Sequence, residues 1–130
     1  MTPRKKILVA DDETNIREIL SIQLARLGYE VLLAADGEEA LQVYKTERPD
    51  LLLLDVLMPR VNGLDVCRKI RALEKKSGRR APVLFLTARG AAHDKTNAVL
   101  SGGDDFIAKP VGLDELREHV EAALNKKARP

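Results

Sequence analysis

Three aspartates follow apolar runs of the sequence in a way that indicates metal chemistry. Asp11 and Asp12 come directly after one run, and Asp55 ends another run further along the chain. Carboxylates held close together repel one another, so a fold that gathers them loses stability unless a cation joins them. Mg²⁺ takes oxygen ligands and is commonly bound through one or two carboxylates and a phosphate group. We therefore expect a site for Mg²⁺, or for Mn²⁺.

Two further side chains complement such a site. Thr87 and Lys109 also stand at the ends of apolar runs. An ammonium group adds positive charge to a metal-loaded acidic pocket. The Thr87 hydroxyl and the main-chain N–H of Ala88 can hold the oxygens of a phosphoryl group. The residue types therefore predict a pocket that receives phosphate.

The elements that must position these residues are visible in the hydrophobic pattern. Apolar runs alternate five times with segments in which apolar side chains recur at helical spacing. Continuous apolar strands separated by helices are typical of a parallel sheet covered on both faces. We expect an α/β, flavodoxin-like doubly wound sheet of five parallel strands, order 2-1-3-4-5, with five helices. The runs are Ile7–Ala10, Val31–Ala34, Leu51–Leu54, Val83–Leu86 and Phe106–Ala108.

In such a sheet, functional groups collect at the carboxyl ends of the strands, near the switch point in strand order. The first, third, fourth and fifth runs deliver their polar residues at this rim. Weakly patterned helical spacing predicts the fourth helix at about 92–100, and the last helix carries apolar residues from Leu113 to Leu124. The topology therefore predicts that three carboxylates, one hydroxyl and one ammonium group converge.

Length and composition favour a single soluble domain. The chain has 130 residues, 45% hydrophobic and 32% charged, with a net charge of +2. No apolar run approaches the ~20 residues of a membrane helix, and a lone cysteine, Cys67, fits a reducing compartment. Basic residues cluster at 75–80 and 126–129 without interleaved aromatics, which favours solvated loops over nucleic-acid binding. We expect a cytoplasmic domain over 1–124 and a flexible tail or linker stub at 125–130.

The stretches "ILVADDE", "LLLLDVLMPRVNG", "LFLTA" and "DDFIAKP" together resemble the receiver domain of bacterial two-component response regulators, the chemotaxis receivers included. The resemblance runs from Lys6 to Leu124, and five spaced functional positions match in order. It implies that Asp55 accepts a phosphoryl group from a histidine kinase or a small phosphodonor. It also implies a cis peptide bond between Lys109 and Pro110.

The resemblance assigns roles to the other residues of the rim. It implies that Asp12, Asp55 and the main-chain carbonyl of Leu57 bind Mg²⁺ directly, with Asp11 acting mainly through water. Phosphoryl oxygens would contact Thr87, Ala88 and Lys109, and Phe106 would be an aromatic switch coupled to Thr87. Three positions depart from the usual pattern, namely Phe106 for tyrosine, Val111 for phenylalanine, and Gly102-Gly103 for Gly-Ala.

The implied function is a phosphorylation-controlled binding switch rather than an enzyme acting on free substrates. Phosphorylation would alter the face built from the helix at 92–100, the strand at 106–108 and the last helix. The implied partners are a sensor histidine kinase or phosphotransfer protein and an unknown downstream protein or effector domain. Neither a membrane nor direct nucleic-acid contact is expected.

Each residue also has an ordinary structural interpretation. Asp11 or Asp12 could cap a helix, Thr87 could be a plain strand residue, and Lys109 could be solvated. A flavin or nucleotide module would need a phosphate loop where this chain has "DDETN". An aspartyl-phosphate phosphatase would carry its nucleophile after the first strand, and a degenerate receiver would lack part of the five-residue set.

Overall fold

The computed structural model describes residues 4–88 and 101–128 of the chain. Five parallel strands form one sheet in the order β2-β1-β3-β4-β5, which confirms the predicted topology. The strands are β1 (Lys6–Ala10), β2 (Glu30–Ala34), β3 (Leu51–Asp55), β4 (Val83–Ala88) and β5 (Asp105–Lys109). Their apolar character follows from position, because β1, β3 and β4 lie inside the sheet and are covered on both faces.

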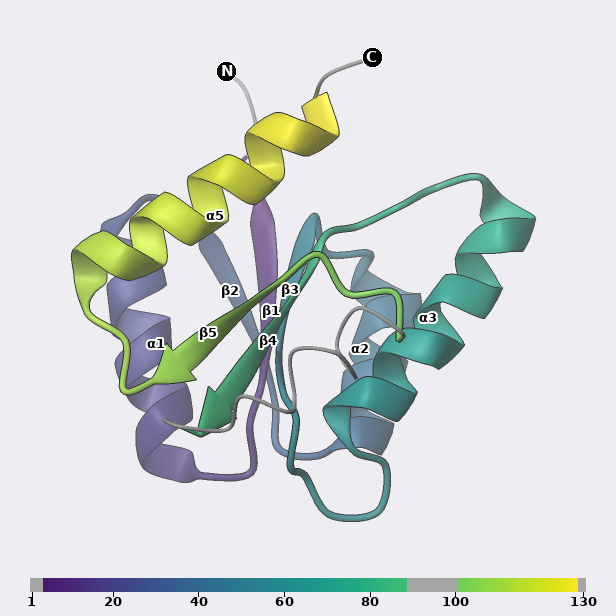
Figure 1. Ribbon diagram of the computed structural model, residues 1–130, viewed down its shortest axis with the longest axis horizontal. Coiled ribbons are helices and arrows are strands. Elements are labelled where there is room, and N and C mark those ends of the chain that lie inside the picture. Colours follow the sequence, from purple (N-terminus) through teal and green to yellow (C-terminus); the bar gives the residue numbers. More distant parts are fainter. Residues whose placement is uncertain (1–3, 89–100, 129–130) are drawn as a thin grey trace.

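Four helices of the described residues cover the sheet, two on each face (Figure 1). One face carries α1 and α5, and the other carries α2 and α3. Alternate residues of β1 show the division, since Val9 packs with the layer beneath α1 and α5, and Leu8 packs with the layer beneath α2 and α3. The helices are α1 (Thr14–Arg26), α2 (Gly37–Glu47), α3 (Gly63–Ser77) and α5 (Leu113–Ala128).

Local sequence signals account for the helix ends. Asp36 accepts the main-chain N–H of Glu39 at 2.8 Å and caps α2, and Asn62 caps α3 in the same way through Asp65. Gly28 follows α1 with a φ of +96°, a conformation that glycine adopts without strain. The helix expected at 92–100 lies outside the described residues.

The flexible tail or linker stub expected over 125–130 stays a prediction. The helix α5 runs to Ala128. The residues after Leu124 include two lysines and an alanine, which are good helix formers. Within the described residues, no helix is long and apolar enough to cross a membrane.

A buried charged network joins α2, α3 and the start of β4. Glu74 is 6% exposed and accepts hydrogen bonds from the Tyr44 hydroxyl at 3.0 Å and the Ala81 N–H at 2.8 Å. The Arg71 guanidinium donates to Glu74 at 2.6 Å and to Asp104 at 2.9 Å. The negative charge of Glu74 is thus fully engaged inside the protein, as a buried carboxylate requires.

Candidate functional site

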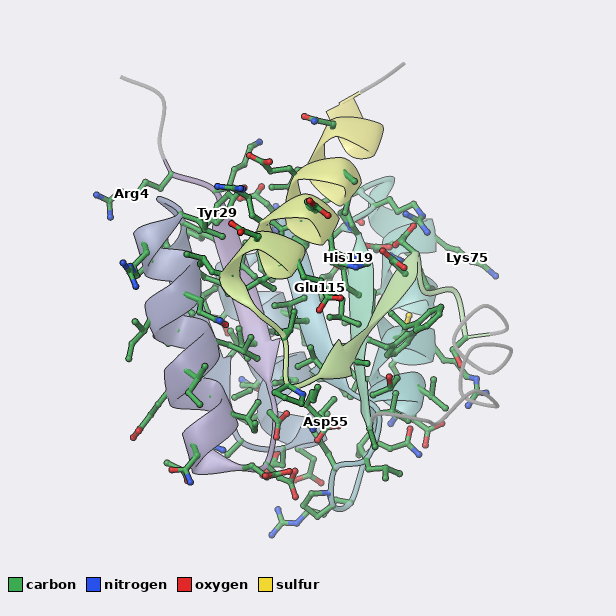
Figure 2. The ribbon with its side chains drawn as sticks, turned by 60° about the vertical axis from the view of Figure 1, so that its left-hand side comes forward. Arg4, Tyr29, Asp55, Lys75, Glu115 and His119 are labelled. Atoms are coloured by element: carbon green, nitrogen blue, oxygen red, sulfur yellow. The ribbon has the colours of Figure 1, made fainter. Side chains whose placement is uncertain are left out.

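The sheet brings the predicted residues to its carboxyl edge. Asp11 follows β1, Asp55 ends β3, and Lys109 ends β5. In the β4–β5 register Ala88 pairs with Lys109, and in the β3–β4 register Asp55 pairs with Leu86. Figure 2 shows Asp55 at the lower end of the sheet, where the strands finish.

The three aspartates form one cluster. One carboxylate oxygen from each of Asp11, Asp12 and Asp55 lies within 4.8 Å of the others. Their surroundings differ, because Asp11 and Asp55 are buried at 0% and 4% exposure while Asp12 is exposed. Three carboxylate oxygens with no sulfur or nitrogen donor suit a hard cation such as Mg²⁺. The donor set therefore fits the predicted metal.

Lys109 provides the positive charge among these acids. Its ammonium lies 3.2 Å from Asp11 Oδ2, 3.3 Å from Asp55 Oδ1 and 3.9 Å from Glu13 Oε1. Burial lowers the pKa of Lys109, but the nearby Asp55 and Asp11 carboxylates outweigh it, so that the pKa lies above its ordinary value. Lys109 therefore remains charged and bridges the two buried aspartates.

Asp55 titrates unusually for an aspartate. Burial, and after it the charge of Asp11, raise the pKa of Asp55 to about 7, although Lys109 and the Leu57 N–H oppose the shift. The Leu57 N–H donates to Asp55 Oδ1 at 3.3 Å. Without a cation, the folded protein therefore disfavours the ionised form of this carboxyl group.

A cavity of about 450 Å³ opens onto this cluster. Asp12, Asp55 and Lys109 all line it, and Leu57 and Ala88 stand at its walls. Thr87, one residue before Ala88, is only 4% exposed and does not line the cavity. The cavity has the size of a small-ligand site and presents the acids and the lysine together.

Phe106 lies further from the acids along β5. It pairs with Phe85 in the β4–β5 register and packs, partly buried, against the apolar layer beneath α2 and α3.

The bond between Lys109 and Pro110 is cis, as the resemblance implies. His119 pairs with Asp105 at 2.6 Å and does not line the cavity. His93 falls outside the described residues.

Two residues of the site were missed by the sequence reasoning. Glu13 lines the cavity, and its place directly after Asp11-Asp12 was the available signal. Gly63 begins α3 so close to β3 that an added Cβ would overlap the main-chain oxygen and carbon of Asp55. Its N–H also donates to the Val56 carbonyl at 3.1 Å. The Asn62-Gly63 pair marks a helix start but does not reveal this close approach.

The helix-cap interpretation of the first acids does not match the structure. The N-cap of α1 is Glu13, and no side chain caps the helix there. Asp11 accepts the Glu13 N–H at 2.9 Å through Oδ1 and holds Lys109 through Oδ2. Asp12 projects to the exposed side of the cluster. The two acids thus serve the rim of the sheet rather than the end of a helix.

The doubly wound parallel sheet, with three aspartates and a lysine at its carboxyl edge, defines an α/β domain whose site lies at the ends of the strands. Residues 7–121 match the model of the response regulator receiver domain. The chain belongs to this family, which confirms the resemblance seen in its motifs. The family comprises the receiver domains of two-component response regulators.

Similar proteins support this assignment. The chain is 42% identical over 122 residues to the alkaline phosphatase synthesis transcriptional regulatory protein PhoP of Bacillus subtilis, covering 94% of this chain and 49% of that protein. It is 43% identical over 121 residues to response regulator MprA of Mycobacterium ulcerans, covering 93% and 50%. The chain thus spans about half the length of the curated relatives it matches.

Solved structures show the same fold. The chemotaxis protein CheY4 of Vibrio cholerae superposes with a TM-score of 0.85 at 30% identity, covering 93% of this chain and 99% of that one. The receiver domain of sensor histidine kinase PA1611 from Pseudomonas aeruginosa gives 0.84 at 32% identity, with 95% and 99% covered. That structure contains a magnesium ion coordinated in the active site cleft.

Proposed function

We propose that Asp55 is the phospho-acceptor of this receiver domain. The observation that carries the proposal is the placement of Asp55, which is buried, faces the 450 Å³ cavity and lies 3.3 Å from the Lys109 ammonium. A carboxylate oxygen of Asp55 attacks the phosphorus in line, and the leaving group departs on the opposite side. Lys109 stabilises the negative charge that spreads over the phosphoryl oxygens.

Asp12, Asp55 and the main-chain carbonyl of Leu57 are the proposed direct ligands of Mg²⁺ or Mn²⁺, with Asp11 acting through water and Lys109. The bound cation would supply charge neutralisation to the acids and the incoming phosphoryl group. Asp11 holds Lys109 in place, because its buried carboxylate accepts from that ammonium at 3.2 Å. Ala88 lines the cavity, and its N–H is the proposed main-chain donor to a phosphoryl oxygen.

The proposed outcome of phosphorylation is a change of binding surface rather than turnover of a free substrate. A dianion on Asp55 attracts the Thr87 hydroxyl, and the space that Thr87 leaves allows Phe106 to turn inward. This movement biases a two-state equilibrium of the face that includes β5 and α5. The helix expected at 92–100, the third element predicted for this face, lies outside the described residues. The proposed partners of this domain, which we expect to be cytoplasmic, are a sensor histidine kinase or phosphotransfer protein and a downstream protein or effector domain.

The test of the proposed function is phosphorylation by a small donor. We expect the protein to gain the mass of one phosphoryl group when it is incubated with acetyl phosphate and Mg²⁺, and Asp55→Asn to gain none. EDTA should prevent the modification. Intact-mass spectrometry makes the measurement. Labelling of Asp55→Asn at the rate of the parent would show that the acceptor lies elsewhere.

A second set of variants separates the chemistry from the switch. Lys109→Ala should reduce the rate of phosphorylation by roughly a hundredfold, the usual scale for one lost stabilising donor. Thr87→Ala and Phe106→Ala should still accept phosphate, because neither residue lines the cavity and Phe106 packs, partly buried, against the layer beneath α2 and α3. Phosphorylated Thr87→Ala should lack the amide chemical-shift changes that the parent shows in β5 and α5. The full set of changes in that variant would contradict the coupling through Thr87.

The side chain of Leu57 is expected to prolong the phosphorylated state. Leu57 is 73% exposed at the cavity wall, where it obstructs an attacking water and offers it no hydrogen bond. An asparagine amide there could orient the water, so Leu57→Asn should lose phosphate several-fold faster than the parent. Arg89, two residues after Thr87 in the sequence, lies outside the described residues. Decay of the phosphorylated mass after donor removal measures both rates, and an equal or slower decay in Leu57→Asn would refute the idea.

A further inference from the structure

A second cavity lies at the opposite end of the sheet from the aspartates. It has a volume of about 280 Å³ and is lined by Tyr44, Lys45, Arg48, Ser77 and Arg79, which we call the basic pocket. These residues come from the carboxyl ends of α2 and α3, two helices that cover the same face of the sheet (Figure 1). Lys75, in the last turn of α3, marks this end in Figure 2, well away from Asp55.

The charge of the basic pocket is not neutralised by neighbouring acids. Three of its five lining residues are cationic and none is acidic. Across residues 4–88 and 101–125, no carboxylate forms an ion pair with Lys45, Arg48 or Arg79. Nearby Glu74 is occupied by its internal partners, and Glu47 pairs with Lys6 at 3.7 Å.

The arginine at the base of this pocket is positioned by the main chain. Arg79 Nη2 donates to the Arg48 carbonyl at 2.8 Å and to the Pro49 carbonyl at 2.6 Å. Main-chain carbonyls fix the guanidinium without cancelling its charge, and the other guanidinium N–H groups have no partner among the described residues. A guanidinium fixed in advance is the form that binds phosphate oxyanions best.

The main chain at Arg48 adopts a conformation that favours glycine over arginine. It is the C-cap of α2 with a φ of +49°, in the left-handed region that suits glycine. Holding a non-glycine residue there costs stability. The Arg48 side chain forms no ion pair within the described residues that would offset this cost. The fold alone therefore does not explain an arginine at this position.

We propose that the basic pocket binds a compact phosphate-bearing anion of the pyrophosphate class. Three cations around 280 Å³ match the charge and size of one or two phosphate groups. The Ser77 hydroxyl is engaged within the protein, because it donates to the Glu74 carbonyl at 3.4 Å and accepts the Arg79 N–H at 3.3 Å. Basic residues at helix carboxyl ends also interact favourably with the helix dipoles. Interaction with the helix dipole explains Lys45 at the end of α2. It does not explain why cationic residues from two helices line one cavity.

The test uses sodium pyrophosphate as the probe, with EDTA present and with sodium chloride at equal ionic strength as the reference. Without metal, the aspartate cluster repels anions, so binding there is suppressed. We expect saturable amide chemical-shift changes in the ¹⁵N-labelled chain, confined to residues 44–48 and 77–79. Arg48→Gly should fold as well as the parent, since glycine suits its φ, and should weaken binding roughly tenfold.

Lys45→Gln should weaken pyrophosphate binding to a similar degree. Lys69→Gln is the matched control, because it removes an exposed lysine of α3 outside the basic pocket. Non-saturable shifts, or shifts unchanged in both Arg48→Gly and Lys45→Gln, would overturn the proposal, and the cations would then serve only the helix ends. A short DNA duplex that binds more tightly than pyrophosphate at the same salt concentration would also overturn it, in favour of a nucleic-acid contact.

Discussion

Asp55→Asn should make the metal-free protein more stable than the parent at pH 8. In the parent, burial and Asp11 raise the pKa of Asp55 from 3.8 to about 7. Ionising this group above pH 7 therefore costs the folded state more than the unfolded chain. A shift of this size corresponds to on the order of 2–4 kcal/mol of unfolding free energy. The uncharged amide has the same shape and avoids the cost.

The pH dependence of this gain follows from the direction of the shift. Below pH ~4 Asp55 is neutral in both the folded and the unfolded protein. Because the folded protein binds this proton more tightly, Asp55 makes its full contribution to the free energy of unfolding there. Between pH ~4 and ~7 the unfolded chain ionises first, so that contribution is lost as the pH rises through the folded pKa. Asp55→Asn lacks this titration. The difference between variant and parent should thus grow from near zero at pH 4 to its maximum above pH 7.

Urea melts in EDTA across this pH range make the measurement. Asp12→Asn is the matched comparison, and its gain should be smaller because Asp12 is exposed to water. Mg²⁺ should stabilise the parent by mass action and both variants less. An Asp55→Asn protein less stable than the parent at pH 8 without metal would mean that the ion pair with Lys109 outweighs burial and repulsion.

Gly63→Ala should both destabilise the fold and slow phosphorylation. The added Cβ would overlap the main-chain oxygen and carbon of Asp55, and backbone atoms cannot move aside without shifting β3 or α3. Overpacking of this kind costs ~1–3 kcal/mol. Because the displaced atoms belong to the proposed acceptor, the rate of labelling by acetyl phosphate should fall together with the free energy of unfolding.

Gly112→Ala is the control for this substitution. No atom lies within 4 Å of a Cβ at Gly112, so only the helix-start preference for glycine over alanine is lost, less than ~1 kcal/mol. Its phosphorylation rate should match that of the parent. If Gly63→Ala retains both the stability and the labelling rate of the parent, the close packing of α3 against β3 does not position Asp55.

The fold was predictable from the sequence because its strands are nearly uninterrupted apolar runs. In β3, all five residues from Leu51 to Asp55 are buried, and Leu51–Leu54 show this directly as four consecutive leucines. The convergence of Asp11, Asp55 and Lys109 then follows from the geometry of a parallel sheet. These predictions needed only the periodicity of the chain and the rule that places sites at carboxyl ends.

Other features depended on contacts that no local pattern encodes. The adjacent acids Asp11 and Asp12 look equivalent in sequence, yet one is buried against Lys109 and the other is exposed. The basic loop was interpreted as solvated, because nothing in the sequence shows that Arg79 reaches the carbonyls of Arg48 and Pro49 some thirty residues earlier. Such pairings arise only when distant elements pack.

The ion pair between Lys109 and Asp11 joins residues that are 98 positions apart in the chain. Lys109 lies at the end of β5, the last strand and an edge of the sheet. Because synthesis runs from the amino end, Asp11 and Asp55 are made before Lys109, their internal counter-charge. Docking of the final strand completes the electrostatic balance of the rim. Contacts between residues so far apart in the chain slow folding. A dissolved cation that binds the aspartates early would favour compact forms before β5 pairs with β4.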